Sequence, residues 1–195
     1  MRRFVQSALR LLGILVLALG PACTLAQDYP SKPIRLVVPY PPGGIGDTLA
    51  RELGTQLAAR MGQPVLVDNK PGASQMIGAE FVAKSPPDGY TLFLGSLSSL
   101  VLNVYAQKAL SYDPFKDFAP VSMFFSTPLY LVVTPSLPVR NVHEFVAYAK
   151  ANPGKLSFGS IGTGSSLHLA GEMFKAMAGV DMLHVPYKGS VPAVT

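Results

Sequence analysis

Three segments rich in glycine and hydroxyl residues contain the amides and side chains best suited to bind an anion. They span residues 42–48, 95–99 and 159–166, and each follows a short apolar run. Glycine lets a backbone approach a ligand closely, and a helix that starts at such a segment offers unpaired N–H groups with a partial positive charge. Together these features predict an anion site that needs no Lys or Arg side chain.

Taken one at a time, the same loops are also consistent with ordinary helix caps and tight turns. Asp47, in the first loop, is either an N-cap of the following helix or a residue that fixes the loop or holds a water molecule. What favours a ligand cleft is the number of such loops. In an open α/β sheet they all lie at the carboxyl ends of the strands, where ligands bind.

Motifs for catalysis and for nucleotide binding are absent from the sequence. Gly162-Thr163-Gly164 lacks the third glycine of a dinucleotide fingerprint, and no Gly-Lys-Ser/Thr follows any glycine loop. Residues 159–162 fall one position short of a Gly-x-Ser-x-Gly elbow. No two carboxylates form an evident acid–base pair. The sequence therefore indicates a binding protein and not an enzyme.

The three histidines are isolated from one another in sequence, so none belongs to a metal-ligand pair. His143 is expected on a helix surface, and His184, between apolar strand neighbours, is expected in the core. His168, in the first turn of its helix, is expected to contact a ligand or to orient the third loop. An alternative remains open, in which a secreted α/β hydrolase uses Ser160 or Ser165 with His168, although no acid partner is visible.

The elements that position these loops follow from the apolar pattern. Predicted strands are 34–39, 64–68, 90–95, 156–160 and 183–187, and predicted helices include 48–60, 142–150 and 165–177. Leu49, Leu53 and Leu57 share one helix face, and Gly62 is suited to end that helix. Strands that alternate with helices predict βαβ units and parallel sheets. The Pro-interrupted segment 118–133 predicts a crossover between two domains.

Three of the five excess positive charges of the chain lie in its N-terminal segment. The net charge of the 195 residues is +5, but Arg2, Arg3 and Arg10 flank a short apolar run that ends in small residues, the pattern of a secretory signal peptide. Removal of residues 1–26 leaves 13 basic and 11 acidic residues, a net charge of +2, scattered along the chain. This excludes the clustered basic face of a nucleic-acid-binding protein. A membrane anchor, or a lipoprotein modified at Cys23, is the less favoured alternative.

Several motifs of the chain resemble those of the Bug-type substrate-binding proteins of tripartite tricarboxylate transporters. The resemblance covers the whole chain after the signal peptide. The motifs are Pro33-Ile34-Arg35-Leu36-Val37-Val38-Pro39-Tyr40-Pro41-Pro42-Gly43-Gly44-x-x-Asp47, Asn69-Lys70-Pro71-Gly72, Pro87-Asp88-Gly89-Tyr90-Thr91-Leu92, Tyr112-Asp113-Pro114-x-Lys116-Asp117-Phe118, Gly162-x-Gly164-Ser165-x-x-His168-Leu169-Ala170-Gly171-Glu172 and Val185-Pro186-Tyr187-Lys188-Gly189.

The resemblance implies a fold, a ligand class and partners. The fold is α/β, a two-lobed type II periplasmic binding protein (Venus flytrap), with residues 27–125 in the first lobe and 126–195 in the second. A small carboxylate metabolite would bind between the lobes, and the protein, a periplasmic monomer, would deliver it to membrane permease subunits. The resemblance implies no cofactor, metal or nucleic acid. The implied ligand-binding residues are Tyr40, Gly43, Gly44, Asp47, Ser96, Ser98, Thr163, Gly164, Ser165 and His168.

Length is the departure from this family, whose members continue well beyond residue 195. We therefore expect an incomplete fold, truncated at the C-terminus, with exposed apolar edges and weak or absent ligand binding. A sensor that binds the ligand without a transport role is a further alternative, and the sequence does not identify the ligand.

Overall fold

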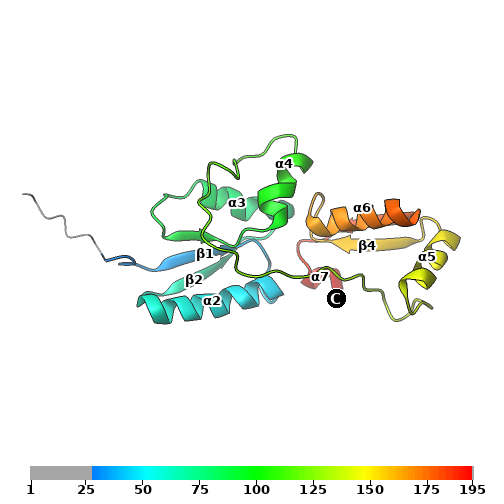
Figure 1. The fold of residues 1–195 in the computed structure, drawn as a ribbon, viewed down its shortest axis with the longest axis horizontal. Coiled ribbons are helices and arrows are strands. Elements are labelled where there is room, and N and C mark those ends of the chain that lie inside the picture. The colour runs from blue at the N-terminus through cyan, green and yellow to red at the C-terminus, as the bar shows by residue number, and fades with distance from the viewer. Residues whose placement is uncertain (1–27, 195) are drawn as a thin grey trace, which may run out of the picture. The chain divides into compact units, whose positions relative to one another are not determined.

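The computed structural model describes residues 28–194, so the predicted signal peptide and Cys23 lie outside the described residues. The first part of the chain forms a three-stranded parallel sheet with the order β2-β1-β3. Helices α2 and α3 lie on opposite faces of this sheet (Figure 1). The elements are β1 (Ile34–Val38), α2 (Ile45–Met61), β2 (Val65–Asn69), α3 (Met76–Ala83) and β3 (Thr91–Phe93).

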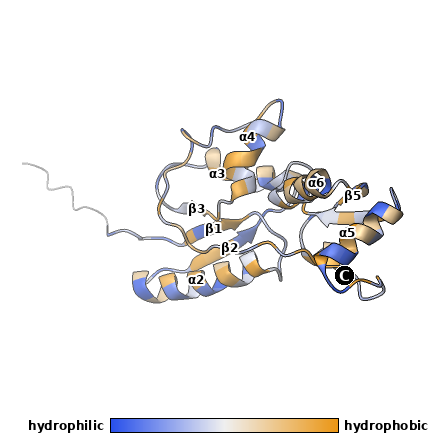
Figure 2. Ribbon diagram, turned by 45° about the vertical axis from the view of Figure 1, so that its right-hand side comes forward, coloured by the Kyte–Doolittle hydropathy of each residue, from blue (hydrophilic) through white to orange (hydrophobic). Residues whose placement is uncertain are grey.

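Burial of apolar strand residues against α2 holds this sheet together. Leu36 and Val38 of β1 form a buried cluster with Ala50 of α2 and with Leu94. In Figure 2, β1 and β2 carry hydrophobic residues, and the turns of α2 alternate between hydrophilic and hydrophobic. Because β1 is central and covered on both faces, its near-continuous apolar run is the pattern expected of a parallel strand.

The second part of the chain repeats this plan on a smaller scale. Strands β4 and β5 pair in parallel. Phe145 and Ala149 pack with Val180 and Met182 in the core, and the ring of Phe145 lies 5.8 Å from that of Phe174. The elements are α5 (Val142–Ala151), β4 (Leu156–Ser160), α6 (Ser166–Ala178), β5 (Met182–Pro186) and α7 (Val191–Val194).

Three short helical elements connect β2, β3 and the rest of the first part. A 3₁₀ turn, η1 (Ala73–Gln75), precedes α3, and a π-helical turn, η2 (Ser98–Leu102), continues into α4 (Asn103–Ala106). Residues 107–141 then contain no helix or strand. Their exposed apolar side chains include Val121, Met123, Tyr130 and Val132. The predicted boundary between residues 125 and 126 falls in this stretch and stays a prediction.

The predicted alternation of strands and helices is confirmed, with shifted boundaries. Helix α2 begins at Ile45, before the predicted start at residue 48, and ends at Met61. Its C-cap is Gly62, whose φ of 69° is left-handed. Strand β3 is shorter than predicted. Among residues 28–194 we find no helix that is both long and apolar enough to cross a membrane.

Candidate functional site

Asp47 organises the first glycine loop. Its carboxylate is 3% exposed and accepts hydrogen bonds from Gly43 N at 2.9 Å, from Arg51 Nε at 3.0 Å and from Asn69 Nδ2 at 2.9 Å. Arg51 also forms an ion pair with it at 2.9 Å. These contacts, the Arg51 hydrogen bond above all, lower the pKa of Asp47 from 3.8 to about 2 although burial acts in the opposite direction. The carboxylate is therefore ionised at any physiological pH.

The N-cap alternative for Asp47 is wrong. The N-cap of α2 is Gly44, which provides no side-chain hydrogen bond, and Asp47 lies inside the first turn of the helix. Because α2 starts earlier than expected, the carboxylate reaches back to Gly43, whose φ is 86°. Both Asp47 oxygens are engaged within the protein, so the geometry fits a residue that fixes the loop.

Tyr40 precedes this loop and packs closely on it. A Cβ placed on Gly46 would lie 2.7 Å from Tyr40 Cδ2, so glycine at 46 leaves room for the ring. The Tyr40 carbonyl accepts a hydrogen bond from Asn69 Nδ2 at 3.1 Å. Asn69 thus joins both ends of the first loop.

The second loop is closed by its own serines. Ser96 Oγ accepts hydrogen bonds from Ser98 N at 3.1 Å and Ser99 N at 3.3 Å, and it donates to Gln75 Oε1. Ser98 is 1% exposed, and its Oγ accepts a hydrogen bond from Ser166 N at 3.0 Å. This last contact joins the second loop to the start of α6.

The third loop is held by uncharged groups. Ser165 is the N-cap of α6: its Oγ accepts from His168 N at 3.3 Å and donates to Gly162 O at 2.6 Å. His168 Nδ1 accepts from Gly164 N at 3.0 Å. Since Nδ1 is an acceptor, the neutral imidazole carries its proton on Nε2, which lies 3.9 Å from Glu172 Oε1.

His184 lies against this loop from strand β5. Its ring centroid is 4.0 Å from that of His168, and its Nε2 is 2.6 Å from Ser160 Oγ. Burial, and then the nearby His168, lower the pKa of His184, which favours the neutral ring. The expected core histidine is thus hydrogen-bonded, although only partly buried, and His143 is exposed on α5 as predicted.

The second and third loops meet directly, and two further contacts join the third and first loops to other segments. Ser74 Oγ donates to Thr163 O at 2.6 Å, beside the contact between Ser98 and Ser166. On the first loop, a Cβ placed on Gly44 would lie 3.9 Å from Ser190 Oγ. The structure therefore brings the second and third loops into direct contact and places the first loop beside the turn that follows β5.

The serine–histidine pair required by the hydrolase alternative is not formed. The Ser165 hydroxyl caps α6, and Ser160 contacts His184 and not His168. Ser160 is also 0% exposed. Among the described residues, no three His, Cys, Asp or Glu side chains gather in a way that would hold a metal ion.

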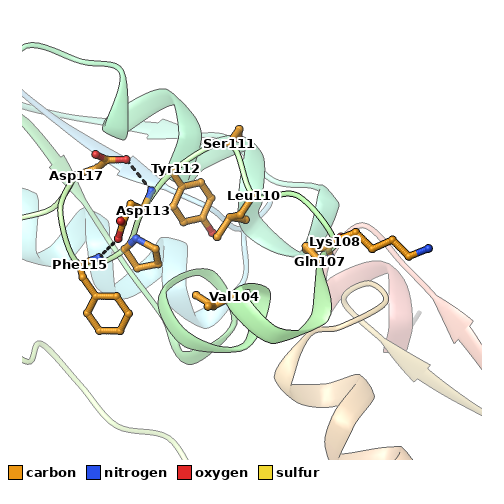
Figure 3. A pocket seen from close by; sticks show the side chains of 10 residues that line it. Val104, Gln107, Lys108, Leu110, Ser111, Tyr112, Asp113, Phe115 and Asp117 are labelled. Carbon is orange, nitrogen blue, oxygen red and sulfur yellow. Dashed lines mark hydrogen bonds between the residues drawn. The ribbon is translucent and has the colours of Figure 1, made fainter.

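Two surface grooves lie away from the predicted ligand residues. One, of about 670 Å³, is bounded by Val104, Gln107, Tyr112 and Phe115 beside α4 (Figure 3). The other, of about 800 Å³, lies over α3 and the start of β1. Neither is lined by the residues predicted to bind the ligand, whose assignment stays a prediction.

Sequence reasoning missed the turn η1. Ala73, Ser74 and Gln75 have φ values of 46°, 51° and 74°, a left-handed conformation that side chains rarely adopt. Ser74 and Gln75 are each 3% exposed and contact the third and second loops. Nothing in the residue types marks a left-handed run without glycine, so the sequence alone does not predict this turn.

Comparison with known proteins identifies related chains. Residues 49–195 match the family described as "Tripartite tricarboxylate transporter family receptor". Protein BugT of Bordetella pertussis is 40% identical over 188 residues, covering 95% of this chain and 58% of the relative. A UPF0065 protein from the tcbD-tcbE intergenic region of Pseudomonas sp. strain P51 is 41% identical, covering 95% and 56%. The chain thus spans about half the length of these relatives.

Solved structures of related proteins have the same fold as this chain. R. palustris Rpa4515 with adipate is 41% identical with a TM-score of 0.83, covering 86% of this chain and 56% of that one. MatC from Rhodopseudomonas palustris with bound malate is 32% identical with a TM-score of 0.79, covering 85% and 56%. The periplasmic binding protein BugD is 34% identical with a TM-score of 0.74, covering 85% and 55%. The predicted α/β periplasmic-binding-protein fold is confirmed.

Proposed function

This chain belongs to the tripartite tricarboxylate transporter receptor family, and on that premise we propose that it is a periplasmic, monomeric solute-binding protein for a small carboxylate. The ligand would bind among the loops 42–48, 95–99 and 159–166 and be passed to the membrane permease subunits of a transporter. The observation that carries the proposal is the direct contact of the second and third loops through Ser98 and Ser166. Relatives with bound adipate and malate support the ligand class.

The start of α2 supplies the clearest donors for a carboxylate. This helix has 17 residues, and its N-cap Gly44 contributes no side-chain hydrogen bond. Its first N–H groups therefore receive no cap from the side chain at this position and lie at the positive end of the helix dipole. The nearby charge of Asp47 is offset by Arg51, so it opposes an incoming anion only weakly.

The strength of such a site is sufficient for solute capture. A hydrogen bond to a charged group contributes about 1.5–3 kcal/mol. Four to six such bonds, less the costs of association and ordering, are compatible with an affinity near micromolar, which corresponds to about −8 kcal/mol.

We further propose that the protein is not an enzyme. The described serines and histidines hold the loops in place, as the Ser165 cap on α6 and the buried Ser160 illustrate. The related proteins are named as binding proteins and transporter receptors, which supports the same assignment. A sensor role without transport would use the same site, and no observation favours it over transport.

Ligand-induced thermal stabilisation tests the proposal. The full in-frame product of the gene is heated with a panel of mono-, di- and tricarboxylates, since a ligand that binds only the native state raises the Tm. We expect at least one carboxylate to raise the Tm, and no shift with any of them would overturn the proposal.

The variant Gly44→Asp locates the site without weakening the fold. Gly44 has an extended conformation (φ −81°, ψ 169°) and room for a Cβ, and Asp is a favoured N-cap, so the variant should be at least as stable as the wild type. Its carboxylate would occupy the N–H groups and repel the ligand, so the Tm shift should disappear. Gln56→Glu, which adds the same charge at an exposed position of α2, should keep the shift.

A further inference from the structure

The side-chain amide of Gln75 is the most unusual polar group near the predicted ligand loops. Its Nε2 is buried and has no hydrogen-bond partner among the described residues. Gln75 as a whole is 3% exposed. A buried donor without a partner costs free energy, because water no longer solvates it and nothing replaces the water. Such a group calls for an acceptor that is not part of the described chain.

The other end of the same side chain fixes where the amide lies. Gln75 Oε1 accepts a hydrogen bond from Ser96 Oγ, which in turn accepts the N–H groups of Ser98 and Ser99. The preceding residue, Ser74, donates to Thr163 O of the third loop at 2.6 Å. Ser74 and Gln75 thus contact the third loop and the second loop respectively, and the Gln75 amide lies next to the second.

The backbone at this position is strained. Ala73, Ser74 and Gln75 all have positive φ, although none is glycine. Asn103 Nδ2, which donates to Ser74 O at 3.0 Å, helps to hold them in this conformation. Strain of this kind persists where the surrounding structure enforces it, and it concentrates at functional sites. Here its effect is to hold the Gln75 side chain against the second loop.

We propose that Gln75 is a ligand-recognising residue whose Nε2 donates a hydrogen bond to a carboxylate oxygen of the bound solute. This inference rests on the proposed function, because it assumes that a carboxylate binds among these loops. It adds one side-chain donor to a site otherwise built from backbone amides and hydroxyls. A ligand that presents a second oxygen acceptor to Gln75 is bound more tightly than an analogue that lacks it.

A buried water is the competing partner for the amide. Asn103 Oδ1 is the other buried side-chain atom without a partner among the described residues. A buried water molecule bonded to Gln75 Nε2 would satisfy this donor without any ligand. In that case Gln75 would contribute to stability and not to ligand affinity, and the two roles are separable by experiment.

Two substitutions at Gln75 separate a role in ligand binding from a role in stability. Gln75→Gly removes the amide and suits the positive φ, so it should leave the Tm unchanged or raised. Gln75→Glu keeps an acceptor for Ser96 and replaces the donor by a like charge. Binding is measured by isothermal titration calorimetry on the full in-frame gene product, with the carboxylate that most raises its Tm. We expect Gln75→Gly to weaken binding about ten- to hundredfold and Gln75→Glu to weaken it more.

Matched controls and outcomes make the test decisive. Ala73→Gly relieves a neighbouring positive φ and keeps the amide, and Gln56→Glu adds a charge elsewhere, so both should retain wild-type affinity. Wild-type affinity in both Gln75 variants, or a lower Tm in Gln75→Gly with unchanged affinity, overturns the inference and leaves the proposed function standing. If the wild type binds no carboxylate, both fail together.

Discussion

The first and third loops have the same position in their strand–helix units and are held by opposite kinds of chemistry. Each is a glycine-rich segment that leads from a parallel strand into a helix. The 42–48 loop depends on an ionised carboxylate, Asp47, paired with Arg51 and bonded to Gly43. The 159–166 loop depends on Ser165, His168 and the adjoining His184, which act as neutral donors and acceptors.

The first and third loops show that a glycine-rich loop proposed to bind an anion can lack a net positive charge. In the first loop the negative charge of Asp47 is offset by Arg51, and in the third the helix cap is a hydroxyl. Neither loop therefore has an unpaired charged side chain that would attract the ligand from a distance. Under the proposed function, ligand recognition depends on backbone geometry, and the two loops should respond differently to mutation and to pH.

Removal of the Asp47 carboxylate should have the largest effect. In Asp47→Ala the Gly43 amide, the Asn69 amide and the Arg51 guanidinium all lose an acceptor. We expect a loss of about 2–3 kcal/mol in the free energy of unfolding, measured by urea denaturation. Glu52→Ala, on the exposed face of the same helix, should change it by less than about 0.5 kcal/mol. Equal losses in the two variants would show that Asp47 does not hold the loop.

The next largest effect should be the loss of folding stability at acid pH that comes from Asp47. Asp47 has a pKa of about 2 in the folded protein against 3.8 otherwise. The ionised Asp47 carboxylate therefore contributes about 2 kcal/mol to the free energy of unfolding. This contribution is complete above about pH 4 and is lost as the pH falls towards 2. Urea denaturation from pH 5 to pH 2 should show the gap between wild type and Asp47→Asn closing over this range. A gap that stays constant would contradict the ion-pair account.

Loss of the helix cap in the third loop should be smaller. Ser165→Ala removes the acceptor for His168 N, which costs about 1 kcal/mol for a typical N-cap. Asn141→Ala removes the equivalent cap of α5, where Asn141 Oδ1 accepts from Glu144 N at 3.0 Å. Both variants should lose similar stability by urea denaturation, but only Ser165→Ala should also weaken ligand binding. Equal binding by the two variants would remove the third loop from the site.

The smallest expected effect is a pH dependence near neutrality from His184. Its pKa in the folded protein is below 6.5, so the unfolded chain takes up a proton first as the pH falls. Stability should therefore decrease as the pH drops below about 6.5, and the decrease ends at the folded pKa. His184→Gln should flatten a Tm profile recorded between pH 7.5 and 5. A Tm profile in His184→Gln that is as steep as that of the wild type would contradict this assignment.

Local patterns in the sequence predicted the elements and the position of the loops. Apolar runs marked the strands, and Gly62 marked the end of α2, because each depends on neighbouring residues only. The contacts that shape the site join distant residues. Asn69 and Asp47 are 22 positions apart, and Ser74 and Thr163 are 89 apart, so no local pattern reveals that they meet.

The left-handed turn η1 was beyond prediction for a different reason. Positive φ is expected at glycine, and in this turn it occurs at three residues that do not favour it. Only the tertiary contacts of Ser74 and Gln75 explain the conformation. The early start of α2, which places Asp47 inside the helix, was missed because helix ends are weakly encoded in sequence.

Backbone amide shifts in a ligand titration test the central claim most directly. The full in-frame product, labelled with ¹⁵N, is titrated with the carboxylate that most raises its Tm while the amides of Gly43, Gly44, Thr163 and Gly164 are followed by NMR. If both loops bind one carboxylate, the two pairs of signals shift together and give the same Kd. Shifts confined to one loop, or two different Kd values, would contradict the account.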